Sequence, residues 1–174
     1  MTGALILAVA FLITPPAQAQ GANSAGWEGW NFLLGQWVGE GSGQPGQGSG
    51  GFSFALDLQG KVLVRKNHAD YPATKDHPAF SHEDLTVIYH EDGASPARAI
   101  YFDNEGHVIH YDASFSKDGT TWVFLSEPGP SSPRYRLTYT KEKNGMLGIK
   151  FEIAPSGKPE AFSTYIEARA RREK

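Results

Sequence analysis

Apolar side chains recur at every second position over most of this chain, in short runs separated by glycine-containing turns. A period of two gives a β-strand one dry and one wet face, because successive side chains point to opposite sides. The dipeptides Asp92-Gly93, Asp118-Gly119 and Asn144-Gly145 suit tight hairpins, since their residues tolerate positive φ angles. We count about ten such runs: 36–41, 51–58, 61–70, 83–91, 97–103, 107–116, 120–126, 134–142, 146–153 and 161–170.

Consecutive strands joined by short turns form an antiparallel meander. Left open, that sheet would expose two edges and one apolar face, and closure into a barrel removes both problems. A two-sheet sandwich stays open as an alternative, although sandwiches usually need longer crossing connections. Ahead of the strands, Trp27, Trp30, Leu33 and Leu34 share one helical face. The pattern therefore predicts an all-β fold, an antiparallel up-and-down barrel of about ten strands with a short N-terminal helix.

The composition excludes several classes of protein. The chain has 174 residues and no cysteine, which rules out disulfides, zinc–thiolate centres and thiol catalysis. Its 16 basic and 19 acidic side chains give a formal charge of −3, so we predict no nucleic-acid partner. Because no linker interrupts the alternation, residues 20–174 are predicted to form a single barrel domain.

Residues 1–19 have the organisation of a cleavable secretory signal peptide. The apolar run from Ala4 to Ile13 is far shorter than the roughly 20 residues of a membrane span. It is followed by the small-x-small cleavage site Ala17-Gln18-Ala19. We therefore predict cleavage near Ala19-Gln20, a periplasmic or secreted mature protein, and no stable membrane span after cleavage. A buried first strand or helix is the alternative.

The segment Phe32-Leu33-Leu34-Gly35-Gln36-Trp37-Val38-Gly39-Glu40-Gly41 resembles the opening of calycin-type barrels. Lipocalins, which belong to that superfamily, begin with a short helical turn and Gly-x-Trp, and Gly35-Gln36-Trp37 matches this motif. With Gly60-Lys61-Val62-Leu63-Val64 following, the chain is similar to lipocalin-like bacterial domains of unknown function and, distantly, to nitrobindin-type ten-stranded haem barrels. The resemblance implies that Trp37 plugs one barrel end beneath an arginine of the last strand, Arg169 or Arg171.

Nitrobindin-like proteins ligate haem iron through a histidine near the C-terminal strands. Residues 111–174 of this chain contain no histidine, so the resemblance transfers no haem ligand. We therefore predict no cofactor.

The dry faces are rich in large aromatic side chains, including several tyrosines. Such a lining suits a pocket for a small, largely apolar molecule with a few polar handles, and it also suits a filled core. In the run 61–70, Lys66 and His68 alternate with Val62 and Val64, which places polar groups on a face that begins apolar. The predicted ligand-binding residues are Phe54, Lys66, His68, Tyr89, Tyr111, Trp122, Phe124, Tyr135 and Tyr139.

The sequence predicts no catalytic residue and no metal site. His110, Asp112 and Ser114 have the residue types of a hydrolase triad, but on one strand their side chains stand parallel, and no Gly-x-Ser-x-Gly elbow exists. The glycines of 41–46 match Gly-x-Gly-x-x-Gly, but a strand follows where a dinucleotide site needs a helix. His107 is three residues from His110, so the two point to opposite strand faces.

The leading prediction is an exported barrel that binds a small, largely apolar ligand without catalysis. Two alternatives stay open, and so does the oligomeric state. One is a small barrel enzyme that uses His68 and Asp70 or a cavity tyrosine for acid–base chemistry. The other is a cell-envelope interaction module whose interior is filled.

Overall fold

The computed structural model describes residues 26–40, 48–91, 96–129 and 131–174. The predicted signal peptide 1–19, the glycine motif 41–46 and the turn Asp92-Gly93 lie outside these described residues. Within the described part of the chain, no helix is long and apolar enough to cross a membrane.

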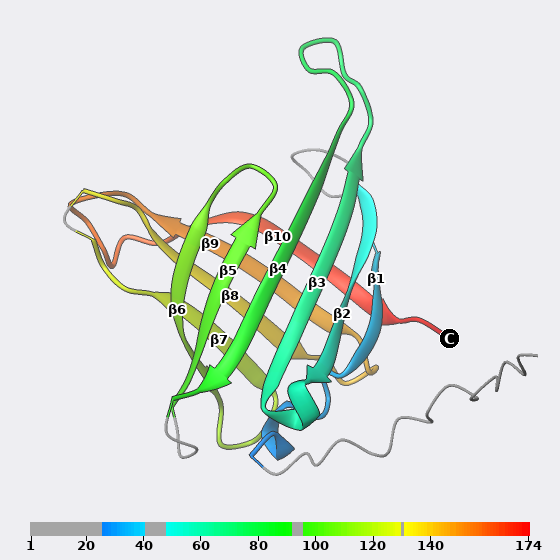
Figure 1. Cartoon of the computed structure of the whole chain (residues 1–174). Coiled ribbons are helices and arrows are strands. Elements are labelled where there is room, and N and C mark those ends of the chain that lie inside the picture. The colour runs from blue at the N-terminus through cyan, green and yellow to red at the C-terminus, as the bar shows by residue number, and fades with distance from the viewer. Residues whose placement is uncertain (1–25, 41–47, 92–95, 130) are drawn as a thin grey trace, which may run out of the picture.

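Ten antiparallel strands follow one another around a closed barrel (Figure 1). Each strand pairs with its neighbours in sequence, and β1 pairs with β10 to close the cylinder. This arrangement confirms the predicted up-and-down barrel over the two-sheet sandwich. The strands are β1 (Gly35–Glu40), β2 (Ser49–Asp57), β3 (Val62–Tyr71), β4 (Phe80–His90), β5 (Ala97–Asp103), β6 (Val108–Phe115), β7 (Thr121–Ser126), β8 (Arg134–Lys141), β9 (Leu147–Ala154) and β10 (Ser163–Arg172).

The hairpin dipeptides behave as expected wherever the structure describes them. Gly119 and Gly145 have φ angles of +66° and +80°, values that side chains with a Cβ rarely adopt. These two turns connect β6 to β7 and β8 to β9 without any crossover.

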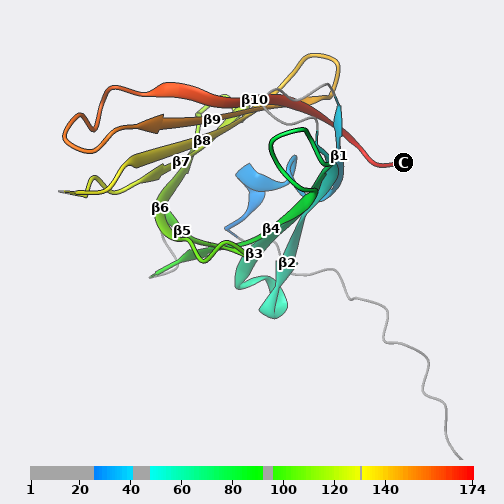
Figure 2. The same ribbon diagram turned by 90° about the horizontal axis from the view of Figure 1, so that it is seen from above.

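The predicted N-terminal helix is a single 3-10 turn, η1 (Glu28–Trp30); a second such turn, η2 (Leu58–Gly60), precedes β3. Hydrogen bonds of the i to i−3 type, from Trp30 N to Trp27 O at 2.8 Å and from Leu33 N to Trp30 O at 2.9 Å, hold the tighter coil. Viewed along the barrel, η1 lies within the ring of strands (Figure 2). We call residues 27–34 the plug segment and the barrel end that holds it the lower end.

Tryptophans fix the plug segment in the lower end. Trp27, Trp30, Trp37 and Trp122 are at most 2% exposed. Three of their indole N–H groups donate to backbone carbonyls: Trp27 to Gly60, Trp37 to Leu33 and Trp122 to Gly29, at 2.8–2.9 Å. Because all four indoles bury a large apolar surface, and three of them do so with the N–H donor satisfied, the lower end is filled and closed.

The arginine over Trp37 is Arg172, not the predicted Arg169 or Arg171. The Arg172 guanidinium lies 4.6 Å from the Trp37 ring centroid and donates to the carbonyls of Phe32, at 2.6 Å, and Leu34. Trp37 pairs with Arg172 in the β1–β10 register, so position 172 shares the inward face with the tryptophan.

Both rejected candidates lie outside the barrel. Arg169 is exposed and donates to Glu142 at 2.8 Å, and Arg171 is paired with Glu40 at 3.0 Å. Gly35 has a φ of +113°, and a Cβ there would lie 2.7 Å from a guanidinium nitrogen of Arg172. The glycine of the Gly-x-Trp motif is therefore needed to admit the arginine.

Arg172→Ala should lower the free energy of unfolding by about 1–2 kcal/mol, because it removes the cation–π contact and leaves two carbonyls of the plug segment without their donor. Arg171→Ala removes an arginine of the same strand whose ion pair is solvent-exposed, and should change stability by less than about 0.5 kcal/mol. Urea unfolding followed by tryptophan fluorescence measures both. Equal losses would show that Arg172 has no special part in closing the lower end.

Candidate functional site

Most of the predicted aromatic lining points into the barrel. Tyr135 is half-buried on the inner face of β8, in line with Leu137 and Tyr139. The remaining predicted aromatic residues on inner faces are at most 3% exposed: Phe54, Tyr111, Trp122, Phe124 and Tyr139. In the lower half of the barrel these rings pack on one another; for example, the ring centroids of Phe54 and Tyr139 are 5.6 Å apart. The lower half is therefore a filled core.

Lys66 and His68 lie on the outer face of β3, against the prediction that they face the interior. Leu63 is fully buried and Arg65 is the next inward residue, so the face that begins with Val62 and Val64 is turned to solvent. The physical reason is that the lower half of β3 is apolar on both faces, and alternation alone does not tell which face is inside.

Tyr89 is also on the outside. It pairs with Val62 across the β3–β4 ladder, whereas its neighbour Ile88 is fully buried opposite Leu63. Like β3, β4 has apolar residues on both faces. For this reason the sequence prediction assigned the wrong face of both strands to the interior.

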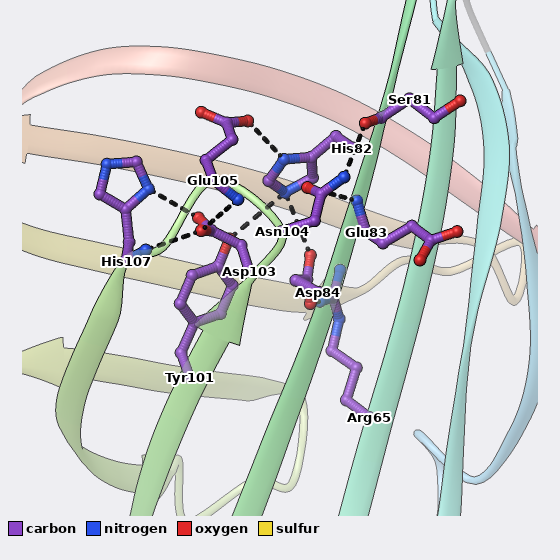
Figure 3. A network of polar contacts seen from close by, with 10 residues as sticks. All are labelled: Arg65, Ser81, His82, Glu83, Asp84, Tyr101, Asp103, Asn104, Glu105 and His107. Atoms are coloured by element: carbon purple, nitrogen blue, oxygen red, sulfur yellow. Dashed lines mark hydrogen bonds and ion pairs between the residues drawn. The ribbon is translucent and has the colours of Figure 1, made fainter.

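The inward faces of β3, β4 and β5 carry an unexpected polar cluster, which consists of Arg65, His82, Asp84, Tyr101 and Asp103 (Figure 3). At its centre Arg65 donates to Asp84, and their side chains are 11% and 5% exposed. Burial opposes the charge of the guanidinium, but the neighbouring Tyr139 and Asp84 raise its pKa overall. A charged pair this far from water needs such mutual compensation.

His82 connects the cluster to the rim of the barrel. Its Nε2 lies 3.4 Å from an Asp84 oxygen, and its Nδ1 lies 2.9 Å from Glu105 on the β5–β6 turn. These contacts with Asp84 and Glu105 raise the pKa of His82 from 6.5 to about 9, although partial burial acts the other way. His82 is therefore a cation at neutral pH.

Asp103 organises the β5–β6 turn at the same end. It accepts hydrogen bonds from the backbone N–H groups of Glu105 and His107, at 3.0 and 2.8 Å, and from the Tyr101 hydroxyl at 3.1 Å. Partial burial opposes its charge, yet the bonds from His107 hold the pKa of Asp103 below its usual range. Burial beside Asp84 and Asp103 raises the pKa of Tyr101, which keeps this phenol protonated.

Two buried polar atoms beside this cluster have no hydrogen-bond partner among the described residues: Nε of Arg65 and the hydroxyl of Tyr139. Tyr139 reaches the guanidinium from β8, on the far side of the barrel, without forming a bond of acceptable geometry. Burial raises the pKa of Tyr139 to about 12, partly offset by the charge of Arg65. An unsatisfied buried polar group destabilises a fold by about 1–3 kcal/mol, so such atoms call for an explanation.

The upper half of the interior, opposite the plug segment, is lined by apolar side chains that solvent still reaches. Leu137, Ile149 and Phe151 point inward with Tyr139, yet each is only partly buried. The Tyr135 ring stacks on Phe151, at 6.0 Å between centroids. Solvent reaches these inward side chains, so the upper half of the interior has an accessible apolar wall on β8–β9, facing the polar cluster on β3–β5.

A separate groove of about 910 Å³ crosses β1 to β5. Each of its two walls is a row of outward side chains that are cross-strand neighbours. One row consists of Gln36, Ser53, Lys66, Leu85 and Phe102. Asp84 and Asp103 of the polar cluster border it as well, but Arg65, Tyr101 and Tyr139 do not. The groove is therefore an outer feature, distinct from the open end.

His68 and Asp70, the predicted acid–base pair, belong to this outer surface. His68 contacts Asp70 through Nε2 at 3.0 Å and Glu83 through Nδ1 at 3.3 Å, and Asp70 also accepts from Ser81 at 2.5 Å. The bond to Asp70 raises the pKa of His68. With a carboxylate on each ring nitrogen, His68 has no free lone pair for a general base.

Among the described residues, no group of three or more His, Asp and Glu side chains is arranged to hold a metal ion. His110, Asp112 and Ser114 are exposed on the outer face of β6, as their spacing predicts. What the interior can do chemically is donate hydrogen bonds from protonated phenols and a guanidinium, next to an apolar wall.

Sequence reasoning missed Arg65, Asp84 and Tyr101. The signal that would reveal them is the same alternation read from Leu63 and Ile88 instead of Val62 and Tyr89, because Arg65 and Asp84 follow in phase from those residues. Charged residues inside a barrel run against the usual preference for apolar interiors, which makes that reading the less obvious one.

Comparison with known proteins adds no closer identification: no family model matches the chain, and no curated protein matches it. The fold itself, a closed antiparallel barrel of ten strands, is compatible with a calycin-like architecture.

His82→Gln should flatten the dependence of stability on pH. An unfolded histidine loses its charge near pH 6.5, whereas folded His82 keeps it to about pH 9. Its ion pairs therefore stabilise the fold fully below pH 6.5, and the stabilisation disappears as the pH rises through 9. After allowance for solvent screening at the rim, we expect the wild type to lose about 1–2 kcal/mol across this window and the variant to lose less.

Urea unfolding at about pH 6 and about pH 9.5 measures the difference. His110→Gln, on the exposed outer face of β6, serves as the control and should keep the wild-type slope. If His82→Gln keeps that slope as well, His82 is not held as a cation in the fold.

Proposed function

We propose that this protein binds a small, largely apolar molecule inside the open upper end of its barrel, without catalysing a reaction. The observation that carries the proposal is the apolar inner wall of Leu137, Ile149 and Phe151, which is partly exposed although it faces inward. Leaving such surface in water is unfavourable by about 25 cal/mol per Å². A ligand of matching shape would cover it, with the phenols and the polar cluster as polar handles.

The interior is a better ligand site than the outer groove. The groove walls include apolar side chains such as Leu85 and Phe102, but their polar side chains are exposed, and His68 and Glu83 are already bonded to each other. The interior instead combines unsatisfied polar atoms with accessible apolar surface, and a bound molecule would relieve both.

Acid–base catalysis has less support than binding. His68 lacks a free nitrogen, and burial raises the pKa values of Tyr101, Tyr111 and Tyr139, so these phenols hold their protons at neutral pH. A cell-envelope module without a ligand would need no accessible interior wall.

We also propose that the chain is a lipocalin-like member of the calycin superfamily. The support is local: the glycine of Gly35-Gln36-Trp37 admits Arg172, and the arginine lies over the tryptophan beneath the plug segment. The resemblance favours ligand binding by analogy of fold, which is weaker support than the interior wall itself.

Export is proposed on the sequence of residues 1–19. Mass spectrometry of the protein from an intact bacterial host should find a mature chain that begins at Gln20 in the periplasmic or secreted fraction. A chain that keeps Ala4–Ile13 and stays in the cytoplasm would contradict this.

Leu137→Trp should block the interior site. The neutral dye N-phenyl-1-naphthylamine becomes fluorescent in apolar surroundings, and we expect it to bind the wild type. A tryptophan at position 137 would fill the upper half of the interior and weaken dye binding by at least about tenfold. Thr138→Trp adds the same ring on the outer face of β8 and should leave dye binding unchanged.

Circular dichroism establishes that both variants are folded. Equal dye binding by the wild type and Leu137→Trp, or no dye binding by the wild type, would contradict an interior site.

A further inference from the structure

The two unpartnered atoms lie together in the interior, one from each side of the barrel. Arg65 extends inward from β3 over the ring of Phe52, at 5.1 Å, and Tyr139 extends inward from β8. The tyrosine is fully buried, and the arginine side chain keeps 11% exposure on the inner face. Nε of Arg65 can only donate a hydrogen bond, whereas the Tyr139 hydroxyl can donate or accept one, so a single acceptor oxygen could serve both groups.

The wall above these atoms is apolar. On β8 the next inward residue after Tyr139 towards the upper end is Leu137, which pairs with Phe151. A molecule resting on that wall would direct its inner end at Tyr139 and Arg65.

The charges around the two atoms include no excess of positive charge. Arg65 and His82 are cations, and Asp84 and Asp103 are anions, all on the inward faces of β3–β5. Glu105 adds a further negative charge at the rim. Tyr101, Tyr111 and Tyr139 stay protonated because burial raises their pKa values.

A carboxylate or phosphate would therefore bring an uncompensated negative charge next to Asp84, in surroundings that solvate it poorly. A neutral oxygen acceptor carries no such penalty. It would also satisfy two donors that have no partner among the described residues.

We infer that the ligand of the proposed interior site is an apolar molecule with a neutral carbonyl group, a ketone, ester or amide, whose oxygen accepts hydrogen bonds from Nε of Arg65 and the hydroxyl of Tyr139. This inference rests on the proposed binding function and names its ligand class.

Three naphthalenes of nearly equal size test the inference as competitors of N-phenyl-1-naphthylamine at neutral pH. The probe 2-acetylnaphthalene carries a ketone, 2-ethylnaphthalene replaces the carbonyl with CH₂, and 2-naphthoate carries a negative charge. We expect the ketone to displace the dye about tenfold more strongly than the ethyl compound, and naphthoate to be the weakest.

Tyr139→Phe should remove most of this preference and bring the ketone within about twofold of the ethyl compound. The variant should remain as stable as the wild type, because the hydroxyl it removes has no hydrogen-bond partner among the described residues. Tyr89→Phe removes a hydroxyl from the outer face of β4 and should keep the full preference.

The outcomes separate the two proposals. Interior binding stands if the dye binds and Leu137→Trp abolishes its binding. In that case the carbonyl inference is still wrong if naphthoate competes as well as the ketone, or if Tyr139→Phe keeps the preference for the ketone over the ethyl compound. If the dye does not bind inside the barrel, the binding function fails and the inference fails with it.

Discussion

Pairing between the first and last strands is the constraint on which the rest of this structure depends. The β1–β10 ladder places Trp37 opposite Arg172, and this register decides which side chains lie inside the closed cylinder. The arginine then bonds to the carbonyls of Phe32 and Leu34, which holds the plug segment in the lower end. Because that end is filled by tryptophans, accessible interior surface is found towards the upper end, where the polar cluster and the apolar wall face each other.

The fold could be predicted from the sequence because its signal is repeated in every strand. Alternation, glycine turns and the need to bury one face of a meander together specify a closed barrel. The predicted N-terminal helix is a short 3-10 turn, Glu28–Trp30, because the spacing of three between Trp27, Trp30 and Leu33 also fits this tighter coil. Gly35, with its positive φ, begins the first strand.

The site could be predicted only in part, and the reason is specific to β3 and β4. Where a strand has apolar residues on one face only, as with Leu137 and Tyr139 on β8, the inward side follows from the sequence. Val62 and Leu63 are adjacent and both apolar, so a shift of one residue exchanges the two faces. Lys66, His68 and Tyr89 were assigned inward for this reason, and the charged residues that do face inward, Arg65 and Asp84, were overlooked. The role of Arg172 could not be predicted, because it depends on the pairing of β1 with β10, two strands far apart in sequence, and local patterns do not specify such a pairing.

The central claim is that a ligand occupies the interior and not the outer groove. Nuclear Overhauser contacts between bound N-phenyl-1-naphthylamine and methyl-labelled leucine and isoleucine side chains test it most directly. Contacts from the dye to the methyl groups of Leu137 and Ile149 are the predicted result. Contacts to Leu85, which lines the groove, without any to Leu137 or Ile149 would contradict the account.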